Sequence, residues 1–256
     1  MEIILVIFIL LGFNFTFWLI ISGLRFIDDA LFKKHPAKYF DMTLEKKKEK
    51  WFFRPKQVAV VVPAYNEELV IADTIKSLVP LVPRKNIFVN TYGSSDKTAD
   101  IASQYQVNVL NDVTNGKTKA EKISNTVKIL KEKHEYKAVL FVDADTRINR
   151  DFLIRGLPYF SDSEVVALAG YATTLWDRSN TPFRNMFYVS YRERVYFFLQ
   201  VVMKYAQTWR NISLSPIIPG FASIYRMDAL SQIDIDPKGL VIEDFNMTFE
   251  VHHKKL

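Results

Sequence analysis

The longest apolar run of the chain lies at its N-terminus. From Ile3 to Leu24 no side chain is charged, and no polar stripe marks a water-facing side of a helix. As a helix, these 22 residues would span about 33 Å, which matches the hydrocarbon layer of a bilayer. The pattern predicts a transmembrane anchor over residues 1–25. A cleaved signal peptide fits less well, because the run is long, Glu2 replaces a basic start and no small-x-small site follows.

A basic stretch follows the apolar run. Residues 25–56 contain ten Lys or Arg against five Asp or Glu, and Lys and Arg gather on the cytoplasmic side of membrane helices. We therefore expect a basic juxtamembrane linker over residues 26–56, a single pass through the cell membrane and a cytoplasmic catalytic domain. The lysines are equally explained as a solvated linker, which would leave the predicted orientation unchanged.

Beyond Pro55, short apolar runs alternate with segments of helical spacing. Strands are predicted at residues 58–62, 87–89, 107–110, 138–142 and 165–169, and helices at 68–78, 96–104, 117–134 and 151–158. This alternation predicts an α/β fold, a mainly parallel Rossmann-like sheet with helices on both faces, whose ligands bind at the C-terminal ends of the strands. We expect the catalytic domain to occupy residues 57–256.

An aromatic and basic region at residues 183–209 interrupts the alternation, and it predicts one or two amphipathic helices. Their aromatic side chains could rest on a membrane surface or pack in a core, and the sequence favours neither. These side chains are Tyr188, Tyr191, Tyr196, Phe197, Phe198 and Trp209.

Composition narrows the chemistry. The 256 residues, of which 49% are hydrophobic, suffice for one catalytic core and an anchor. Cysteine is absent, which excludes disulfides, thiolate metal sites and a cysteine nucleophile. The net charge of +6 arises chiefly in the basic stretch at residues 25–56, so nucleic acid is not expected as a partner.

Asp143 and Asp145 directly follow the predicted strand at residues 138–142. Two carboxylates one residue apart at a strand end can hold a hard divalent cation, which in turn binds the oxygens of a diphosphate. The same pair could instead cap a helix that begins near Asn149, and the pair alone does not decide between the two.

Six motifs, in order across residues 58–250, resemble those of glycosyltransferase family 2. Val60–Glu68 reads Val-Val-Val-Pro-Ala-Tyr-Asn-Glu-Glu and resembles the family's opening motif. Gly93–Ala99 resembles its Gly-Ser-x-Asp-x-Thr segment, and Lys119-Ala120 resembles the pair that meets the donor phosphates.

The remaining three motifs complete the resemblance. Asp143-Ala144-Asp145 is similar to the family's metal motif, and Pro219–Arg226 to the loop that lines the acceptor site. Ile242-Glu243-Asp244 resembles the segment that supplies the general base.

The resemblance implies a nucleotide-sugar transferase type A fold and a function. The chain looks like a processive synthase of poly-N-acetylglucosamine, hyaluronan, chitin or cellulose, which transfers a hexosyl or N-acetylhexosaminyl group with inversion from a nucleotide diphosphate sugar, expected to be a UDP-sugar. The acceptor would be a growing polysaccharide. The implied substrate-binding residues are Pro63, Tyr65, Glu67, Thr91, Lys119, Asp143, Gly220 and Arg226.

The resemblance also implies the parts of the catalytic machinery. Asp143 and Asp145 would hold Mg²⁺ or Mn²⁺, and the metal and Lys119 would stabilise the leaving diphosphate. Asp244 would take the proton of the acceptor hydroxyl, with Glu243 orienting it. Taken alone, Asp244 is explained better by the preference of acids for the start of a helix, and the ordered set of motifs reverses that.

The chain departs from the family pattern at two places. Thr91 and Tyr92 stand where most members have an aspartate pair that reaches the nucleotide base, so Asn90, Thr91 or a backbone group would have to replace it. The sequence also stops at Leu256, before the Gln-x-x-Arg-Trp helix of processive members, which leads us to expect a C-terminally truncated catalytic domain.

Two alternatives to polysaccharide synthesis stay open. The chain could be a non-processive transferase that glycosylates a lipid carrier, or a non-catalytic homologue that keeps the fold without turnover. The product size and metal-dependent nucleotide binding distinguish them.

Overall fold

The structure, a computed structural model, describes residues 2–32, 53–111, 118–133, 135–175, 182–209, 211–212, 217–237, 239 and 242–256. Contacts within the chain divide it into two compact units. Residues 1–38 and 171–215 form the first unit, and residues 39–170 and 216–256 form the second. The predicted linker lysines between positions 33 and 50 lie outside the described residues.

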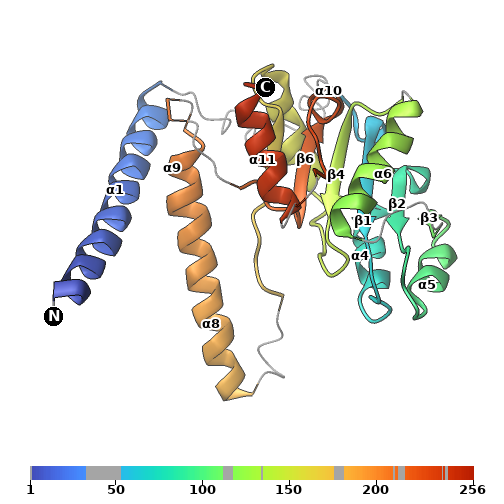
Figure 1. Cartoon of the computed structure of the whole chain (residues 1–256), viewed down its shortest axis with the longest axis horizontal. Helices are drawn as coiled ribbons and strands as arrows, with labels where there is room; N and C mark the ends of the chain where they lie inside the picture. The colour runs from blue at the N-terminus through green and yellow to red at the C-terminus, as the bar shows by residue number, and fades with distance from the viewer. Residues whose placement is uncertain are drawn as a thin grey trace. The chain divides into compact units, whose positions relative to one another are not determined.

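A six-stranded sheet lies at the centre of the second unit, in the order β3-β2-β1-β4-β6-β5 (Figure 1). Its strands are β1 (Val58–Pro63), β2 (Ile87–Asn90), β3 (Asn108–Leu110), β4 (Ala138–Val142), β5 (Ala167–Ala169) and β6 (Ala222–Arg226). The pairs β1/β2, β1/β4 and β2/β3 are parallel, whereas β6 is antiparallel to both β4 and β5. The predicted α/β class is confirmed, with a mixed sheet because β6 runs against the other strands.

Helices cover both faces of this sheet. On one face lie α4 (Ile71–Leu78), α5 (Thr98–Gln104), α7 (Phe152–Gly156) and the 3₁₀ helix η4 (Leu157–Ser161), and on the other lie α6 (Lys119–Glu132), α10 (Met227–Leu230) and α11 (Glu243–His253). The short 3₁₀ helices η1 (Pro55–Gln57) and η2 (Arg84–Asn86) precede β1 and β2. β1 is buried on both sides, with Val60 in one core and Val61 in the other, which explains its continuous β-branched sequence.

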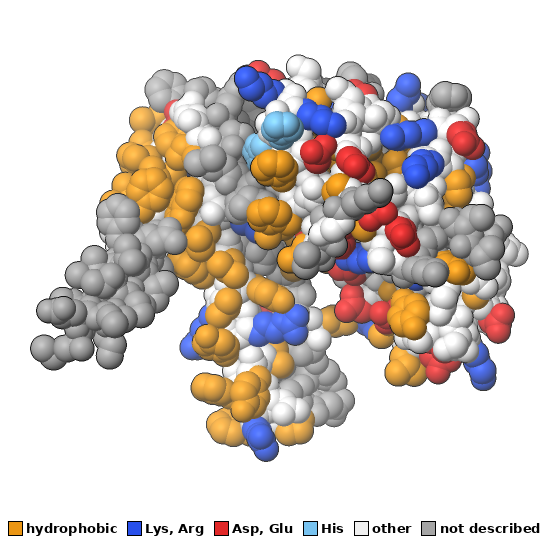
Figure 2. All heavy atoms as spheres, viewed as in Figure 1, with side chains coloured by type: hydrophobic (Ala, Val, Ile, Leu, Met, Phe, Trp, Pro, Cys, Tyr) orange, Lys and Arg blue, Asp and Glu red, His pale blue; other side chains and the backbone are white. Residues whose placement is uncertain are grey.

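The first unit is helical. It contains α1 (Glu2–Phe32), α8 (Phe183–Phe197), the π-helical segment η5 (Phe198–Lys204) and α9 (Tyr205–Gln207). Hydrophobic side chains gather along α8 in the lower part of Figure 2. Tyr188 and Tyr191 are 60% and 64% exposed, so of the two predicted locations for these tyrosines, a packed core is not observed.

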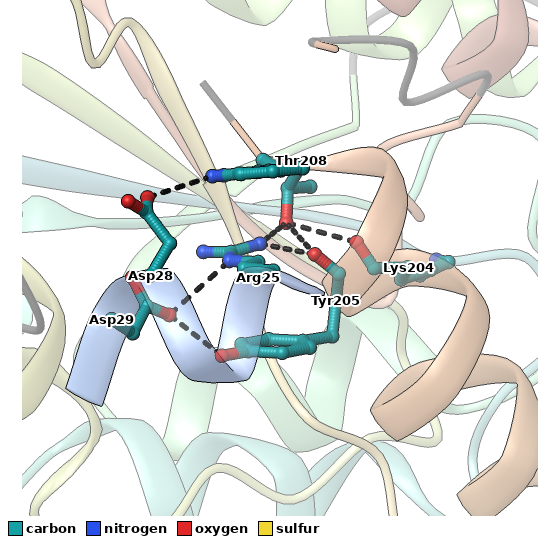
Figure 3. Close-up of polar contacts among 7 residues, drawn as sticks. Arg25, Asp28, Asp29, Lys204, Tyr205 and Thr208 are labelled. Carbon is teal, nitrogen blue, oxygen red and sulfur yellow. Dashed lines mark hydrogen bonds and ion pairs between the residues drawn. The ribbon is translucent and has the colours of Figure 1, made fainter. Parts of the chain in front are cut away.

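Polar contacts join α1 to α9 within this unit (Figure 3). Arg25 donates hydrogen bonds to the Tyr205 carbonyl and to Thr208 Oγ1, and its guanidinium carbon lies 4.1 Å from the centroid of the Tyr205 ring. Asp29 forms an ion pair with Arg25 and accepts a hydrogen bond from Tyr205 Oη at 2.6 Å. Hydrogen bonds and an ion pair therefore hold α1 and α9 together in addition to packing.

The prediction of a transmembrane anchor is wrong. Within the part of the chain that the structure describes, no helix combines the length and the apolar character needed to cross a bilayer. α1 contains the predicted segment but continues beyond it through Arg25, Asp28 and Asp29, and α9 engages Arg25 and Asp29. The expected single-pass location in the cell membrane, from which a cytoplasmic catalytic domain was inferred, is therefore wrong as well.

Candidate active site

Lys119 connects two segments that are far apart in the sequence. Its Nζ lies 2.9 Å from Asp143 Oδ1 and 2.6 Å from Glu243 Oε1. Burial lowers the pKa of Lys119, but the charges of these carboxylates and the hydrogen bonds to them outweigh burial and raise it above its ordinary value. The lysine is therefore held as a cation between two carboxylates, at the C-terminal edge of β4.

A capping box places Lys119 at the start of α6. Thr118 Oγ1 accepts a hydrogen bond from the Glu121 N–H, and the Glu121 carboxylate accepts one from the Thr118 N–H. This reciprocal pair satisfies two backbone donors that a helix start otherwise leaves free. It fixes the first turn of α6, where Lys119 is the first helical residue.

Asp244 lies beside this lysine at the start of α11. The Gly220 N–H donates to Asp244 Oδ2 at 3.3 Å, and a Cβ added to Gly220 would lie 3.5 Å from Lys119 Nζ and 3.9 Å from Asp244 Cβ. Thr248 holds the loop before Gly220, because its Oγ1 accepts a hydrogen bond from the Ile218 N–H. Glu243 and Asp244 both stand in the first turn of α11, where the helix dipole favours negative charge.

The loop after β4 presents Asp143 and Asp145 on either side of a buried alanine. Ala144 is 5% exposed, and its carbonyl accepts a hydrogen bond from Thr74 Oγ1 of α4 at 2.6 Å. Ser77 of the same helix accepts a hydrogen bond from the Ile148 N–H. With the residue between them turned inward, Asp143 and Asp145 remain partly or fully open to solvent.

Glu67 adds a further carboxylate to this edge of the sheet. Burial is the main cause that raises the pKa of Glu67, and the nearby charges of three aspartates add to it, namely Asp145, Asp96 and Asp143. Acidic side chains also gather in the middle of Figure 2, beside the ends of α6 and α11, with Lys or Arg among them. Negative charge therefore accumulates here.

Two loops that carry predicted motifs are hydrogen-bonded to each other. Asn66, at the backbone angle φ 55°, accepts a hydrogen bond from the Ser95 N–H at 2.8 Å. Asp96 accepts hydrogen bonds from the Glu68 N–H and the Thr98 N–H, each at 3.0 Å. Although desolvation raises it, the hydrogen bonds from Thr98 and Glu68 hold the pKa of Asp96 below its ordinary value.

Tyr65 and Thr91 lie at the ends of neighbouring strands but in different surroundings. The Tyr65 side chain is 62% exposed and its ring passes Gly93, where an added Cβ would lie 3.6 Å from the ring. Thr91 is fully buried, and its Oγ1 has no hydrogen-bond partner among the described residues. Pro63 ends β1, paired in register with Asn90 of β2.

Arg226 is the predicted site residue that the structure does not bring to this edge. It pairs with Ala138 at the start of β4, whereas Asp143 follows the end of that strand. Its guanidinium donates to the carbonyls of Phe160, Asp162 and Val165, at 2.7–2.8 Å. A cavity of about 510 Å³, whose lining includes Phe53, Tyr136 and Arg226, has neither Asp143 nor Asp244 in its lining.

The described residues could hold a divalent cation only if a bound ligand supplied further coordinating oxygens. Among them, no group of three or more His, Cys, Asp or Glu side chains is arranged to hold a metal ion. Mg²⁺ in phosphate-transfer sites uses one or two carboxylates and completes its shell with phosphate oxygens and water. Asp143 and Asp145 suffice for that, and the accumulated negative charge near Glu67 favours a cation there.

Some residues that shape this site were not predicted from the sequence. Lys122 of α6 is buried at 3% exposure and reaches the Ala64 carbonyl, and Asn66 joins the two motif loops. Lys122 follows Lys119 by three positions, which puts both on one face of a helix, so the spacing was the available signal. Asn66 offered a weaker signal, because asparagine tolerates a positive φ.

In open α/β sheets, ligands bind outside the C-terminal ends of the strands, and the carboxylates around Lys119 lie at such an edge. Residues 55–256 match the profile of the family described as Glycosyltransferase like family 2. The chain belongs to this family, and its prediction as a glycosyltransferase is confirmed.

Individual relatives agree with this family. A segment of 70 residues is 40% identical to the "Probable glycosyltransferase YdaM" of Bacillus subtilis (strain 168), and the match covers 25% of this chain and 17% of that protein. The chain thus matches less than a fifth of that relative's length.

Solved structures share the fold. Glucosyl-3-phosphoglycerate synthase from Mycobacterium tuberculosis, in complex with Mn²⁺, UDP-glucose and glycerol 3-phosphate, is 17% identical with a TM-score of 0.53, over 83% of this chain and 70% of that one. A structure described as a mycobacterial protein is 18% identical with a TM-score of 0.56, over 84% and 67% of the two chains.

Proposed function

We propose that the chain transfers a sugar, with inversion, from a nucleotide diphosphate sugar to a hydroxyl of an acceptor. The observation that carries this proposal is the bridge from Asp143 through Lys119 to Glu243, at 2.9 and 2.6 Å, with Asp244 beside it. It joins the candidate donor-binding Asp143 to Glu243, the neighbour of the candidate general base Asp244, across 100 residues of sequence. A UDP-sugar is the proposed donor, since the solved M. tuberculosis enzyme was crystallised with UDP-glucose.

Asp244 is the proposed general base. Its Oδ2 accepts a hydrogen bond from the Gly220 N–H, and its Oδ1 accepts one from the Phe245 N–H, so the carboxylate is oriented by backbone groups. An acceptor hydroxyl that approaches Gly220 would give its proton to this carboxylate as the sugar–oxygen bond forms. Glu243 is proposed to hold Lys119 and so to keep the cluster in place.

Lys119 is proposed to receive the departing diphosphate. It is a cation at the start of a helix, and both the ammonium and the helix N-terminus favour phosphate oxygens. Asp143 and Asp145 would hold a divalent cation, Mg²⁺ or Mn²⁺, which when bound neutralises charge on the leaving group. Tyr65 and Glu67 are proposed to flank the nucleoside, and Pro63 and Thr91 to line the donor end of the site.

The proposed acceptor is a growing polysaccharide. Phe245, 49% exposed, directly follows Asp244, and an exposed aromatic ring beside the base would suit the apolar face of a sugar ring. Gly220 leaves room next to Asp244 for an acceptor hydroxyl. We place Arg226 outside this site, since its guanidinium is occupied by three carbonyls.

A turnover assay tests the proposal. The protein is incubated with radiolabelled UDP-glucose or UDP-N-acetylglucosamine and Mn²⁺, with oligosaccharide, lipid-phosphate and glycerol 3-phosphate acceptors in separate arms. Labelled, size-resolved saccharide that requires Asp244 is the expected result. A single-sugar lipid product would show that the acceptor is a lipid and not a polysaccharide. Release of no UDP in any arm would contradict the proposed reaction.

A further inference from the structure

Lys122 is a buried cation that the proposed reaction does not use. It lies on α6 with 3% of its surface exposed, whereas lysine is almost never buried without a partner. Its Nζ donates a hydrogen bond to the Ala64 carbonyl at 2.8 Å. No ion pair joins it to a carboxylate within the described part of the chain.

Burial of this ammonium opposes folding. Desolvation lowers the pKa of Lys122, and a single neutral carbonyl compensates a buried charge only in part. An apolar side chain of similar length would avoid this cost. Because the charge of Lys122 opposes folding, we look for its role in the groups that the ammonium contacts.

The second contact of Lys122 is an aromatic ring of the candidate active site. Its Nζ lies 5.3 Å from the centroid of the Tyr65 ring, within the range of a cation–π attraction. Tyr65 directly follows Ala64, so the lysine holds both the backbone and the side chain of the same short segment. Gly93, with φ +84°, approaches the same ring.

These contacts give Tyr65 a defined position although its side chain is largely in solvent. An exposed tyrosine on a loop ordinarily exchanges between rotamers, and a ligand that stacks on it must then pay for ordering it. The cation and the close backbone at Gly93 restrict the ring before any ligand arrives, and its 62% exposure leaves aromatic surface available.

We propose that Lys122 is a positioning residue for the sugar donor, which fixes Tyr65 as the platform on which the planar base of the nucleotide stacks. This inference rests on the proposed function. It requires the charge of Lys122, and it assigns the lysine to recognition of the base and not to the diphosphate or to proton transfer.

Two probes separate these roles by calorimetry. The affinity for UDP with Mn²⁺ depends on contacts to both the uracil and the diphosphate. The affinity for inorganic diphosphate with Mn²⁺ depends on contacts to the diphosphate alone. Lys122→Met should weaken UDP about tenfold, the effect of a lost cation–π contact and its ordering, and leave inorganic diphosphate unchanged. Lys122→Arg should bind UDP within about threefold of the wild type, because it keeps the charge.

The coupling to Tyr65 distinguishes positioning from general support of the fold. Tyr65→Ala should weaken UDP to a similar extent, and the double variant Lys122→Met/Tyr65→Ala should be no weaker than Tyr65→Ala. Should Lys122→Met fail to fold, Lys122→Gln serves in its place, because it keeps a donor for Ala64 without the charge.

Three results would overturn the inference: wild-type affinity for UDP in the uncharged variant, an equal loss of both probes, or additive losses in the double variant. Failure of the wild type to bind UDP at all would instead contradict the proposed function. The two failures are therefore distinguishable.

Discussion

At the scale of single residues, the site depends on unlike charges held close together. Lys119 pairs with Asp143 and Glu243, while Asp244 is oriented by the N–H groups of Gly220 and Phe245. Lys119 and the proposed base Asp244 therefore lie in one cluster but make different contacts. Substitutions at Lys119 and Asp244 should consequently affect different steps.

Asp244→Asn should remove transfer and spare donor binding. The amide keeps the shape of the side chain but cannot accept the acceptor proton, so kcat should fall by about 10²–10⁴-fold. Turnover with a UDP-sugar and calorimetry with UDP measure the two effects. Asp100→Asn, an exposed carboxylate on α5, is the matched control. Equal loss of binding and turnover would contradict the role of Asp244 as base.

Lys119→Met should weaken donor binding. The phosphate oxygens lose a charge-assisted hydrogen bond, and Asp143 and Glu243 lose their shared cation, so we expect about tenfold weaker UDP binding or more. Lys128→Met, an exposed lysine on the same helix, is the control. Unchanged UDP affinity in Lys119→Met would mean that the diphosphate binds elsewhere.

At the level of strands and helices, the candidate site lies at the C-terminal ends of the parallel strands. The contacts of Arg226 stabilise the opposite end of the sheet. Arg226 ends β6 and ties its end to the carbonyls of η4 and the segment before β5. The loops at the opposite edge are joined by Asn66 and Asp96.

Arg226→Met should destabilise the fold without a specific effect on the site. Three carbonyls would lose a buried donor, which we expect to lower the free energy of unfolding by about 3 kcal/mol. Chemical denaturation measures this. Arg155→Met, which removes an exposed arginine that pairs with Asp151, should cost less than about 1 kcal/mol. A stable Arg226→Met variant with weakened acceptor binding would instead restore Arg226 to the acceptor site.

Asp96 should make the joined loops sensitive to acid. Its pKa is lower in the folded chain than the ordinary value of 3.8, so its stabilising contribution is present above that value and is lost as the pH falls through the folded pKa. The difference in unfolding free energy between the wild type and Asp96→Asn should therefore shrink on acidification below about pH 4. A difference that is independent of pH would show that Asp96 stays protonated or unpaired.

Local patterns predicted most of the elements but not their convergence. β1 and β4 were evident because a strand buried on both faces reads as a continuous apolar run. β6 was missed and read as part of a loop, since Ala222–Arg226 is defined by its pairing with β4 and β5. That reversed strand leads to α11, so the approach of Glu243 to Lys119 depends on pairing between distant segments, which no local window contains.

At the scale of the whole molecule, the chain is two units with different construction. Contacts group residues 171–215 with the N-terminal helix in the first unit. The uncharged run at residues 3–24 misled the interpretation of α1. The helix continues past this run through Arg25 and Asp29, which contact Tyr205 of α9, and Asp28, which contacts Trp209.

Arg25→Leu should loosen the first unit and leave the sheet intact. Loss of the contacts to Tyr205 and Thr208 should lower hydrogen-exchange protection in α9 by about tenfold or more, with the amides of β1 and β4 unchanged. Arg194→Leu, an exposed arginine on α8, is the control. Equal loss of protection in β1 would show that the two units unfold together.

We propose that a nucleotide diphosphate binds at the edge of the sheet where Tyr65, Lys119 and Asp143 lie. Calorimetric titration of UDP into the wild type, with and without Mn²⁺, and into Asp143→Asn/Asp145→Asn tests it most directly. We predict saturable binding that requires Mn²⁺ in the wild type and is lost in the double variant. Absence of binding in the wild type, or equal binding in the double variant, would show that the nucleotide diphosphate does not bind at this edge.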